Sequence, residues 1–184
     1  MITLTAPTDL QIGAFLNMQR ESALTYPEVG ATRGGTLPVG YQVDFRIEHV
    51  GRNWEAARRA LAGWEMHEAA GVRVMPAEPA REALTVALIV KAGVFMTSAC
   101  RVVYTIDEPD RFGFAYGTLG DHPVAGEEQF LLTLGPEGAV TFSLLAFSRA
   151  RSLLFRVATP IARRKQLALG DAYIAAMRAF ATDR

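Results

Sequence analysis

The chain has only one cysteine and no long hydrophobic run. Cys100 is the single cysteine among 184 residues, which excludes an internal disulfide and fits a reducing compartment. The longest apolar run, at residues 83–90, ends at Lys91 and is far shorter than the roughly 20 residues of a transmembrane helix. The first fifteen residues lack the basic and apolar regions of a signal peptide. We therefore expect a cytoplasmic protein without a transmembrane span.

An excess of one charge is also missing. Lys and Arg together number 19, and Asp and Glu together number 19. This balance argues against nucleic acid as the main partner. The three histidines, His49, His67 and His122, are isolated, and no metal-binding, glycine-rich phosphate-binding or GxSxG motif occurs. We expect neither a metal nor a cofactor.

The hydrophobic pattern predicts one domain over residues 1–184, with a helix at 8–22, a long loop at 23–41 and a strand at 41–50. A helix at 53–71 follows, with Trp54, Ala57, Leu61 and Trp64 on one face. Six strand-like runs lie between residues 72 and 148, and their short connections favour an antiparallel meander. A long C-terminal helix, kinked near Pro160, is expected from Ala150 onward.

The strand at 41–50 has the clearest alternation. Tyr41, Val43, Phe45 and Ile47 alternate with polar residues, so the period of two predicts that the apolar face is buried. The fold class is therefore α+β, with a strongly curved, seven-stranded antiparallel sheet and a long helix across its concave face.

Four sequence segments carry a family resemblance: LTYPEVGAT at 24–32, CRVVYTIDEPDRFGFAYGTL at 100–119, HPVAGEEQF at 122–130 and FSR at 147–149. They resemble an uncharacterised family within the START and birch-pollen-allergen-like superfamily, whose fold is called helix-grip. The resemblance covers residues 15–180. It implies a ligand cavity between the sheet and the C-terminal helix, used by some members to carry lipids or hydrophobic metabolites and by others for cyclase or hydrolase chemistry.

Polar side chains on adjacent predicted strands suggest where a ligand would bind. If residues 107–110 form a hairpin turn, Arg101 lies opposite Tyr116, and Glu127 or Glu128 lies beside Tyr116. A shift of one residue would move any of these side chains to the other face. An arginine, a phenol and a carboxylate together could bind an anionic group or polarise a carbonyl. The alternative is an exposed ion pair of little energetic value.

Three hypotheses remain open at this point. In the first, Arg101, Tyr104, Tyr116 and Glu127 or Glu128 orient a small hydrophobic or amphipathic ligand, Phe114 and Phe147 line the cavity, and the loop that carries Tyr26 closes its rim. In the second, Glu127 or Glu128 is the general base of an enzyme. In the third, the aromatic side chains Phe112, Phe114, Phe130 and Phe142 fill the interior, and the protein is an interaction module.

The start of the last helix is locally basic. Its cationic residues are Arg149, Arg151, Arg156, Arg163, Arg164 and Lys165. They either solvate one helical face or attract an anionic membrane surface. Besides a small-molecule ligand, the sequence therefore leaves open a peripheral membrane contact through this segment.

Overall fold

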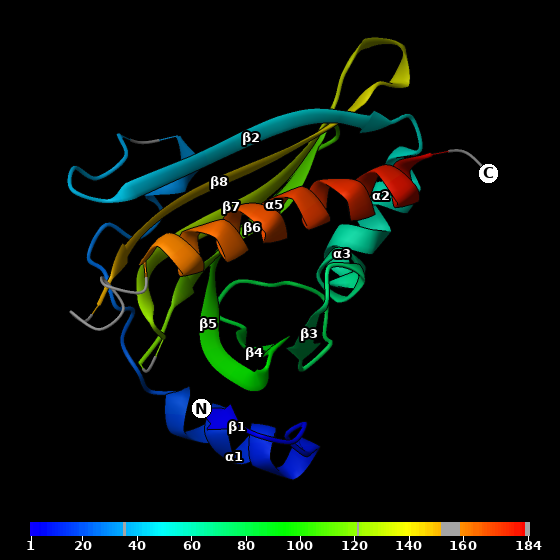
Figure 1. Ribbon diagram of the computed structural model, residues 1–184. Helices are drawn as coiled ribbons and strands as arrows, with labels where there is room; N and C mark the ends of the chain where they lie inside the picture. Colours follow the sequence, from blue (N-terminus) through cyan, green and yellow to red (C-terminus); the bar gives the residue numbers. More distant parts are fainter. Residues whose placement is uncertain (35, 121, 152–158, 183–184) are drawn as a thin grey trace.

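The computed structural model describes residues 1–34, 36–120, 122–151 and 159–182, and no side chain of residues 159–162. Its centre is a curved antiparallel sheet with the strand order β2-β8-β7-β6-β5-β4-β3 (Figure 1). The strand bounds are β2 Gln42–Gly51, β3 Val72–Met75, β4 Thr85–Ala92, β5 Val94–Asp107, β6 Arg111–Thr118, β7 Val124–Leu134 and β8 Val140–Ala150. These seven strands confirm the predicted sheet. A two-residue strand that the pattern did not indicate, β1 (Ile2–Thr3), pairs with β5.

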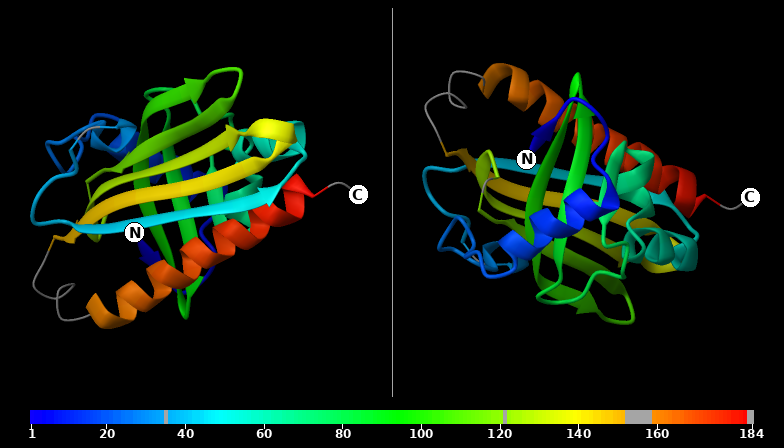
Figure 2. Two further views of the ribbon diagram at one scale, coloured as in Figure 1. Left: turned by 90° about the horizontal axis from the view of Figure 1, so that it is seen from above. Right: turned by 90° about the horizontal axis from the view of Figure 1, so that it is seen from below.

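The long helix α5 (Thr159–Ala181) crosses the concave side of the sheet, and Figures 1 and 2 show the sheet curving around it. We call the side that faces α5 the inner face and the opposite side the outer face. Large side chains of both elements share one buried cluster, including Phe130, Phe142, Tyr173 and Met177. The helix-grip fold predicted from the sequence is therefore confirmed.

The strand β2 buries the opposite face to the one predicted. Its apolar residues lie on the outer face, where Phe45 and Ile47 are each 60% exposed. Its polar residues face α5 instead, and Arg46 pairs with Asp171 at 2.6 Å. Alternation shows that a strand has two different faces, but the partner decides which face is buried, and α5 presents charged groups to this strand.

Two further ion pairs flank that contact, Asp44 with Arg163 and Glu48 with Arg178. The helix can approach the strand closely because α5 has Gly170 at the crossing point. A Cβ atom there would lie 2.7 Å from the Nε atom of Arg46.

The helix α1 (Asp9–Gln19) covers the outer face. Thr8 and Gln11 form a capping box at its N-terminus, which satisfies backbone donors that the first turn leaves free. Ile12 and Phe15 pack against Ala87 and Ile89 of β4. The predicted helix at 8–22 is confirmed with shorter bounds.

The predicted helix at 53–71 is two helices, α2 (Trp54–Ala62) and α3 (Glu65–Ala69). They are separated by Gly63 and by Trp64, which has a φ of 64° in the left-handed region. The indole of Trp64 is fully buried and donates to the carbonyl of Glu78 at 2.7 Å. Burial of this large ring compensates for a backbone conformation that side chains disfavour. The prediction of one continuous helix was wrong.

The described part of the predicted C-terminal helix is α5, which spans Thr159–Ala181. Pro160 is the second residue of α5, a position where the missing backbone donor costs no helical hydrogen bond. The predicted kink depends on the residues before Thr159 and stays a prediction. Residues 152–158, part of the predicted helix and including the basic Arg156, lie outside the described residues. No helix in the described part of the chain is long and apolar enough to cross a bilayer.

Candidate functional site between the sheet and the long helix

A bulge in β5 decides which polar side chains meet. The pairing of β5 with β6 shifts between Val102 and Tyr104, so that Val102 lies opposite Tyr116 and Arg101 lies opposite Gly117. The predicted pairing of Arg101 with Tyr116 was wrong by one residue. Because successive side chains of a strand point to opposite faces, Arg101 lies on the outer face and Tyr116 on the inner face.

The Arg101 side chain forms hydrogen bonds at the C-terminal end of α1. Its guanidinium donates to the carbonyl oxygens of Arg20 at 2.7 Å and Ser22 at 3.1 Å, and its Nε to the Thr85 hydroxyl at 3.3 Å. The carbonyls at a helix C-terminus lack intrahelical donors and carry partial negative charge. Arg101 therefore fixes α1 to the sheet.

The inner face carries a carboxyl–phenol pair. Glu128 lies opposite Tyr116, as one of the two predicted alternatives required, and the Tyr116 hydroxyl donates to Glu128 Oε2 at 2.8 Å. Burial raises the pKa of Glu128 to about 7, the Tyr116 hydrogen bond opposes this rise, and the charge of Asp44 adds to it. The Glu128 side chain nonetheless keeps partial solvent access. A carboxyl group whose pKa is near 7 can exchange a proton with a ligand, or pair with its charge, under physiological conditions.

His67 of α3 extends this site into the aromatic interior. It is fully buried, and among the described residues neither ring nitrogen has a hydrogen-bond partner. Its ring centroid lies 5.0 Å from those of Phe130 and Tyr173 and 6.0 Å from that of Tyr116. Burial lowers the pKa of His67 to about 3, so the ring is neutral at pH 7.

The outer face holds a second polar network around Glu127. This buried carboxylate accepts from the Tyr26 hydroxyl at 2.7 Å, from the backbone of Gly30 at 2.7 Å, and from the backbone and hydroxyl of Thr32 at 3.0 and 2.5 Å. Burial, followed by the bond to Glu127, raises the pKa of Tyr26. Because its four acceptor positions are occupied, Glu127 anchors the 24–33 loop to the sheet.

Tyr104 closes the same network. Its hydroxyl lies 2.7 Å from that of Thr32 and accepts from Gln129 at 2.8 Å. Phe147 packs edge-on against Tyr26, with ring centroids 5.4 Å apart. Gly117 is required beside them, because a Cβ there would lie 2.1 Å from the Tyr26 hydroxyl.

The eight residues named from the sequence thus form two groups on opposite sides of one sheet. Tyr116, Glu128 and Phe114 lie on the inner face, whereas Arg101, Tyr104, Glu127, Tyr26 and Phe147 lie on the outer face. The sequence predicted only that His67 is isolated from other metal-binding residues, and it did not single out Tyr173 or Thr32. Their spacing carries no signal, because each is brought to the site from a distant helix or loop.

Accessibility differs along the inner face. Near α2 and α3, Leu132, Phe142 and Val140 are fully buried. Farther along β7 and β8, and on the neighbouring strand β2, Glu128, Ser148 and Asp44 are half-buried. Partial solvent access on this part of the inner face therefore belongs to a few polar residues, whereas Tyr116, Ala146 and Tyr173 beside Glu128 are buried. Cys100 is buried in the same core, and burial raises the pKa of its thiol, which agrees with a small apolar packing role.

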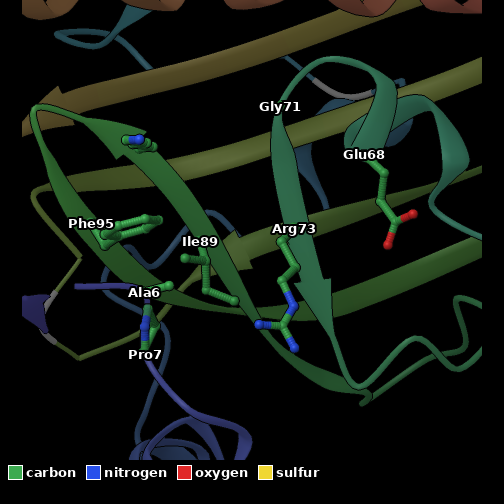
Figure 3. A pocket seen from close by; sticks show the side chains of 8 residues that line it. Ala6, Pro7, Glu68, Gly71, Arg73, Ile89 and Phe95 are labelled. Carbon is green, nitrogen blue, oxygen red and sulfur yellow. The ribbon is translucent and has the colours of Figure 1, made fainter.

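Two surface hollows lie on the outer face. One, of about 380 Å³, is bordered by Ala6, Pro7, Glu68, Arg73, Ile89 and Phe95 (Figure 3). The other, of about 600 Å³, lies between α1 and the β3–β4 connection. Arg73, at the first hollow, already pairs with Asp9 at 2.7 Å, and neither hollow gathers the polar groups of the inner face.

The basic residues before and within α5 are mostly engaged. Arg149 lies 4.6 Å from the ring centroid of Tyr41, Arg151 donates to the carbonyl of Gly120, and Arg163 pairs with Asp44. Arg164 and Lys165 are exposed. Solvation of one helical face and contact with an anionic membrane surface both stay predictions for these two residues.

Comparisons with known proteins agree with the fold and identify a family. The chain is 38% identical to a UPF0548 protein of Deinococcus radiodurans over 176 residues, which cover 88% of this chain and 89% of the relative. Among solved structures, the hypothetical protein jhp0584 from Helicobacter pylori matches with a TM-score of 0.57 at 10% identity, over 86% of this chain and 96% of that one.

The di-domain ARO/CYC StfQ from the steffimycin biosynthetic pathway matches with a TM-score of 0.56 at 12% identity, over 77% of this chain and 51% of that one. Likeness at such low identity establishes the fold alone. Residues 25–176 match the family model described as a domain of unknown function, DUF1990. The chain therefore belongs to this DUF1990 family, in which relatives carry the name UPF0548.

Proposed function

We propose that the protein binds a small hydrophobic or amphipathic molecule between the inner face of the sheet and α5. The observation that carries this proposal is Glu128, a carboxyl that faces the interior and keeps partial solvent access. A buried carboxyl is costly unless it is paired or reached by a polar partner. Tyr116 supplies one hydrogen bond, and a ligand's polar group would supply another.

The surroundings of Glu128 suit an apolar ligand body. Ala146 lies directly opposite Glu128 on β8, and the aromatic rings of Tyr116, Tyr173 and Phe130 lie around the same region. Ligand sites commonly combine apolar and aromatic walls with a few polar anchors. The half-buried residues Asp44 and Ser148 mark the proposed entrance.

An enzyme on the same scaffold is the second candidate. A pKa of about 7 for Glu128 is suited to a general base at neutral pH. The arginine proposed from the sequence as its partner is absent from this face, because Arg101 lies on the outer one. Any such chemistry would therefore rely on Glu128, Tyr116 and His67.

The interaction-module hypothesis gains support only from the buried aromatic rings. Phe114, Phe130 and Phe142 are each at most 1% exposed, whereas Phe112 and Glu128 keep partial solvent access. These two sets of residues therefore favour different hypotheses, and a direct binding measurement decides between them.

The test uses Nile red, an uncharged amphipathic dye, together with two matched variants. Ala146→Phe would place a phenyl ring beside Glu128 where the proposed ligand lies, whereas Leu145→Phe adds the same ring one residue away on the outer face. We expect dye fluorescence to rise with wild type and Leu145→Phe, and to fall at least tenfold with Ala146→Phe. Cooperative urea unfolding checks that each variant is folded. Equal dye binding by a folded Ala146→Phe variant would contradict an interior site.

A further inference from the structure

We propose that the inner-face site selects a ligand whose polar end donates hydrogen bonds, above all a protonated primary amine, and disfavours carboxylic acids. This inference rests on the proposed function, because it concerns the ligand class of the same site. It reverses the sequence-based hypothesis of an anion site, which depended on Arg101. That arginine lies on the other side of the sheet and is bound to backbone carbonyls.

Among the described acidic residues of the inner face, Glu128 is the one without a cationic partner. The ion pairs of Asp44 with Arg163, Arg46 with Asp171 and Glu48 with Arg178 are each neutral in sum. Among the described residues, no cation forms an ion pair with Glu128. An incoming acid would therefore meet a second acid without a compensating charge, whereas an ammonium group would meet its counter-ion.

The hydrogen-bonding groups of the site lead to the same ligand class. Tyr116 spends its only hydrogen on Glu128 Oε2, and within the described chain Glu128 has no second donor. His67 is neutral, so one of its two unpartnered ring nitrogens is an acceptor. The site thus offers an unfilled acceptor on Glu128, and the neutral ring of His67 adds one acceptor and one donor. A head group with several N–H donors satisfies more of these acceptors than an acid can.

Proton linkage makes the proposal measurable. The groups that act on Glu128 are Tyr116 of β6 and Asp44 of β2, which is paired with Arg163 of α5. Glu128 in turn raises the pKa of the nearby Tyr173 and Cys100, which are un-ionised. With a pKa of about 7, Glu128 is about half protonated at pH 7. An ammonium group favours the ionised form, so its binding at pH 7 releases about half a proton per bound amine on average. Amine affinity should fall about tenfold between pH 8 and pH 6, the ratio of the ionised fractions.

The experiment compares three probes that share one apolar body: 2-naphthylmethylamine, 2-naphthalenemethanol and 2-naphthoate. Isothermal titration calorimetry at pH 6, 7 and 8, in two buffers with different ionisation enthalpies, gives the affinity and the number of protons released. We expect the amine to bind at least tenfold more tightly than 2-naphthoate at pH 8, with the alcohol between them. The alcohol should show no proton release.

Two variants separate charge from shape. Glu128→Gln keeps the size and a carbonyl acceptor but removes the charge, so amine affinity should fall to that of the alcohol and lose its pH dependence. Glu48→Gln is the matched control, since Glu48 is an inner-face acid that already has a cation in Arg178. It should leave all three affinities within about twofold.

Each other outcome has a distinct meaning. Tightest binding of 2-naphthoate would overturn the amine preference and leave the proposed ligand-binding function standing. Unchanged amine affinity in Glu128→Gln would overturn the role of Glu128. Binding of none of the probes to wild-type protein would overturn both this inference and an apolar ligand site beneath α5.

Discussion

The free energy of unfolding should depend on pH through Glu128, and replacement by glutamine should remove that dependence. The pKa of Glu128 rises from its ordinary 4.5 to about 7 in the folded protein, chiefly because burial penalises the charged form. The folded state therefore binds a proton more tightly than the unfolded chain. The contribution is complete below pH 4.5 and is lost as the pH rises through 7.

The magnitude follows from the size of the shift. A rise of this extent corresponds to about 3 kcal/mol, because each pH unit is worth about 1.4 kcal/mol. Partial solvent access of the side chain makes this figure an upper bound. The free energy of unfolding of Glu128→Gln minus that of wild type should therefore increase by up to about 3 kcal/mol between pH 4.5 and pH 8.5.

Urea unfolding of both proteins between pH 4.5 and 8.5 measures this difference directly. Titration of His67 and His122 affects both proteins, so it cancels in the comparison. Tyr116→Phe is the control, because its hydroxyl opposes the rise in the pKa of Glu128, and its loss should move the transition to higher pH. A stability difference that stays constant across this range would refute the reasoning.

Three further predictions concern the neighbouring networks. Glu127→Gln should lower the free energy of unfolding by about 2–3 kcal/mol, because it weakens several charge-assisted hydrogen bonds, whereas Tyr26→Phe removes one bond and should cost about 1 kcal/mol. Urea unfolding at pH 7 measures both losses. Equal losses would contradict the central place of Glu127 in this network. His67→Phe should stabilise the protein increasingly as the pH falls below 6.5, since the lowered pKa of His67 costs stability there; a parallel pH profile would argue against a neutral buried ring. Arg101→Leu should speed amide exchange in α1 with little change in β7, and uniform faster exchange would point to global destabilisation instead.

Particular elements show how far sequence reasoning reaches. The six strands after residue 72 were predicted because each run is bounded by turn residues, and the short connections force neighbouring strands to be antiparallel. Counting through the turn limited the partner of Tyr116 to Glu127 or Glu128, and the structure selects Glu128. Arg101 could not be placed in this way, because a single bulged residue in β5 reverses the face of every residue beyond it. No composition signal marks that bulge.

The sequence by itself determined the α+β class, the order of the elements and the family, because periodicity, turn chemistry and local motifs are properties of neighbouring residues. Only the tertiary structure decided which faces are used. The charged contacts from α5 turned the polar side of β2 inward, and the folding of α3 against the sheet brought His67 to the aromatic rings near Glu128. Such choices depend on partners far away in the chain, whose positions no local pattern encodes.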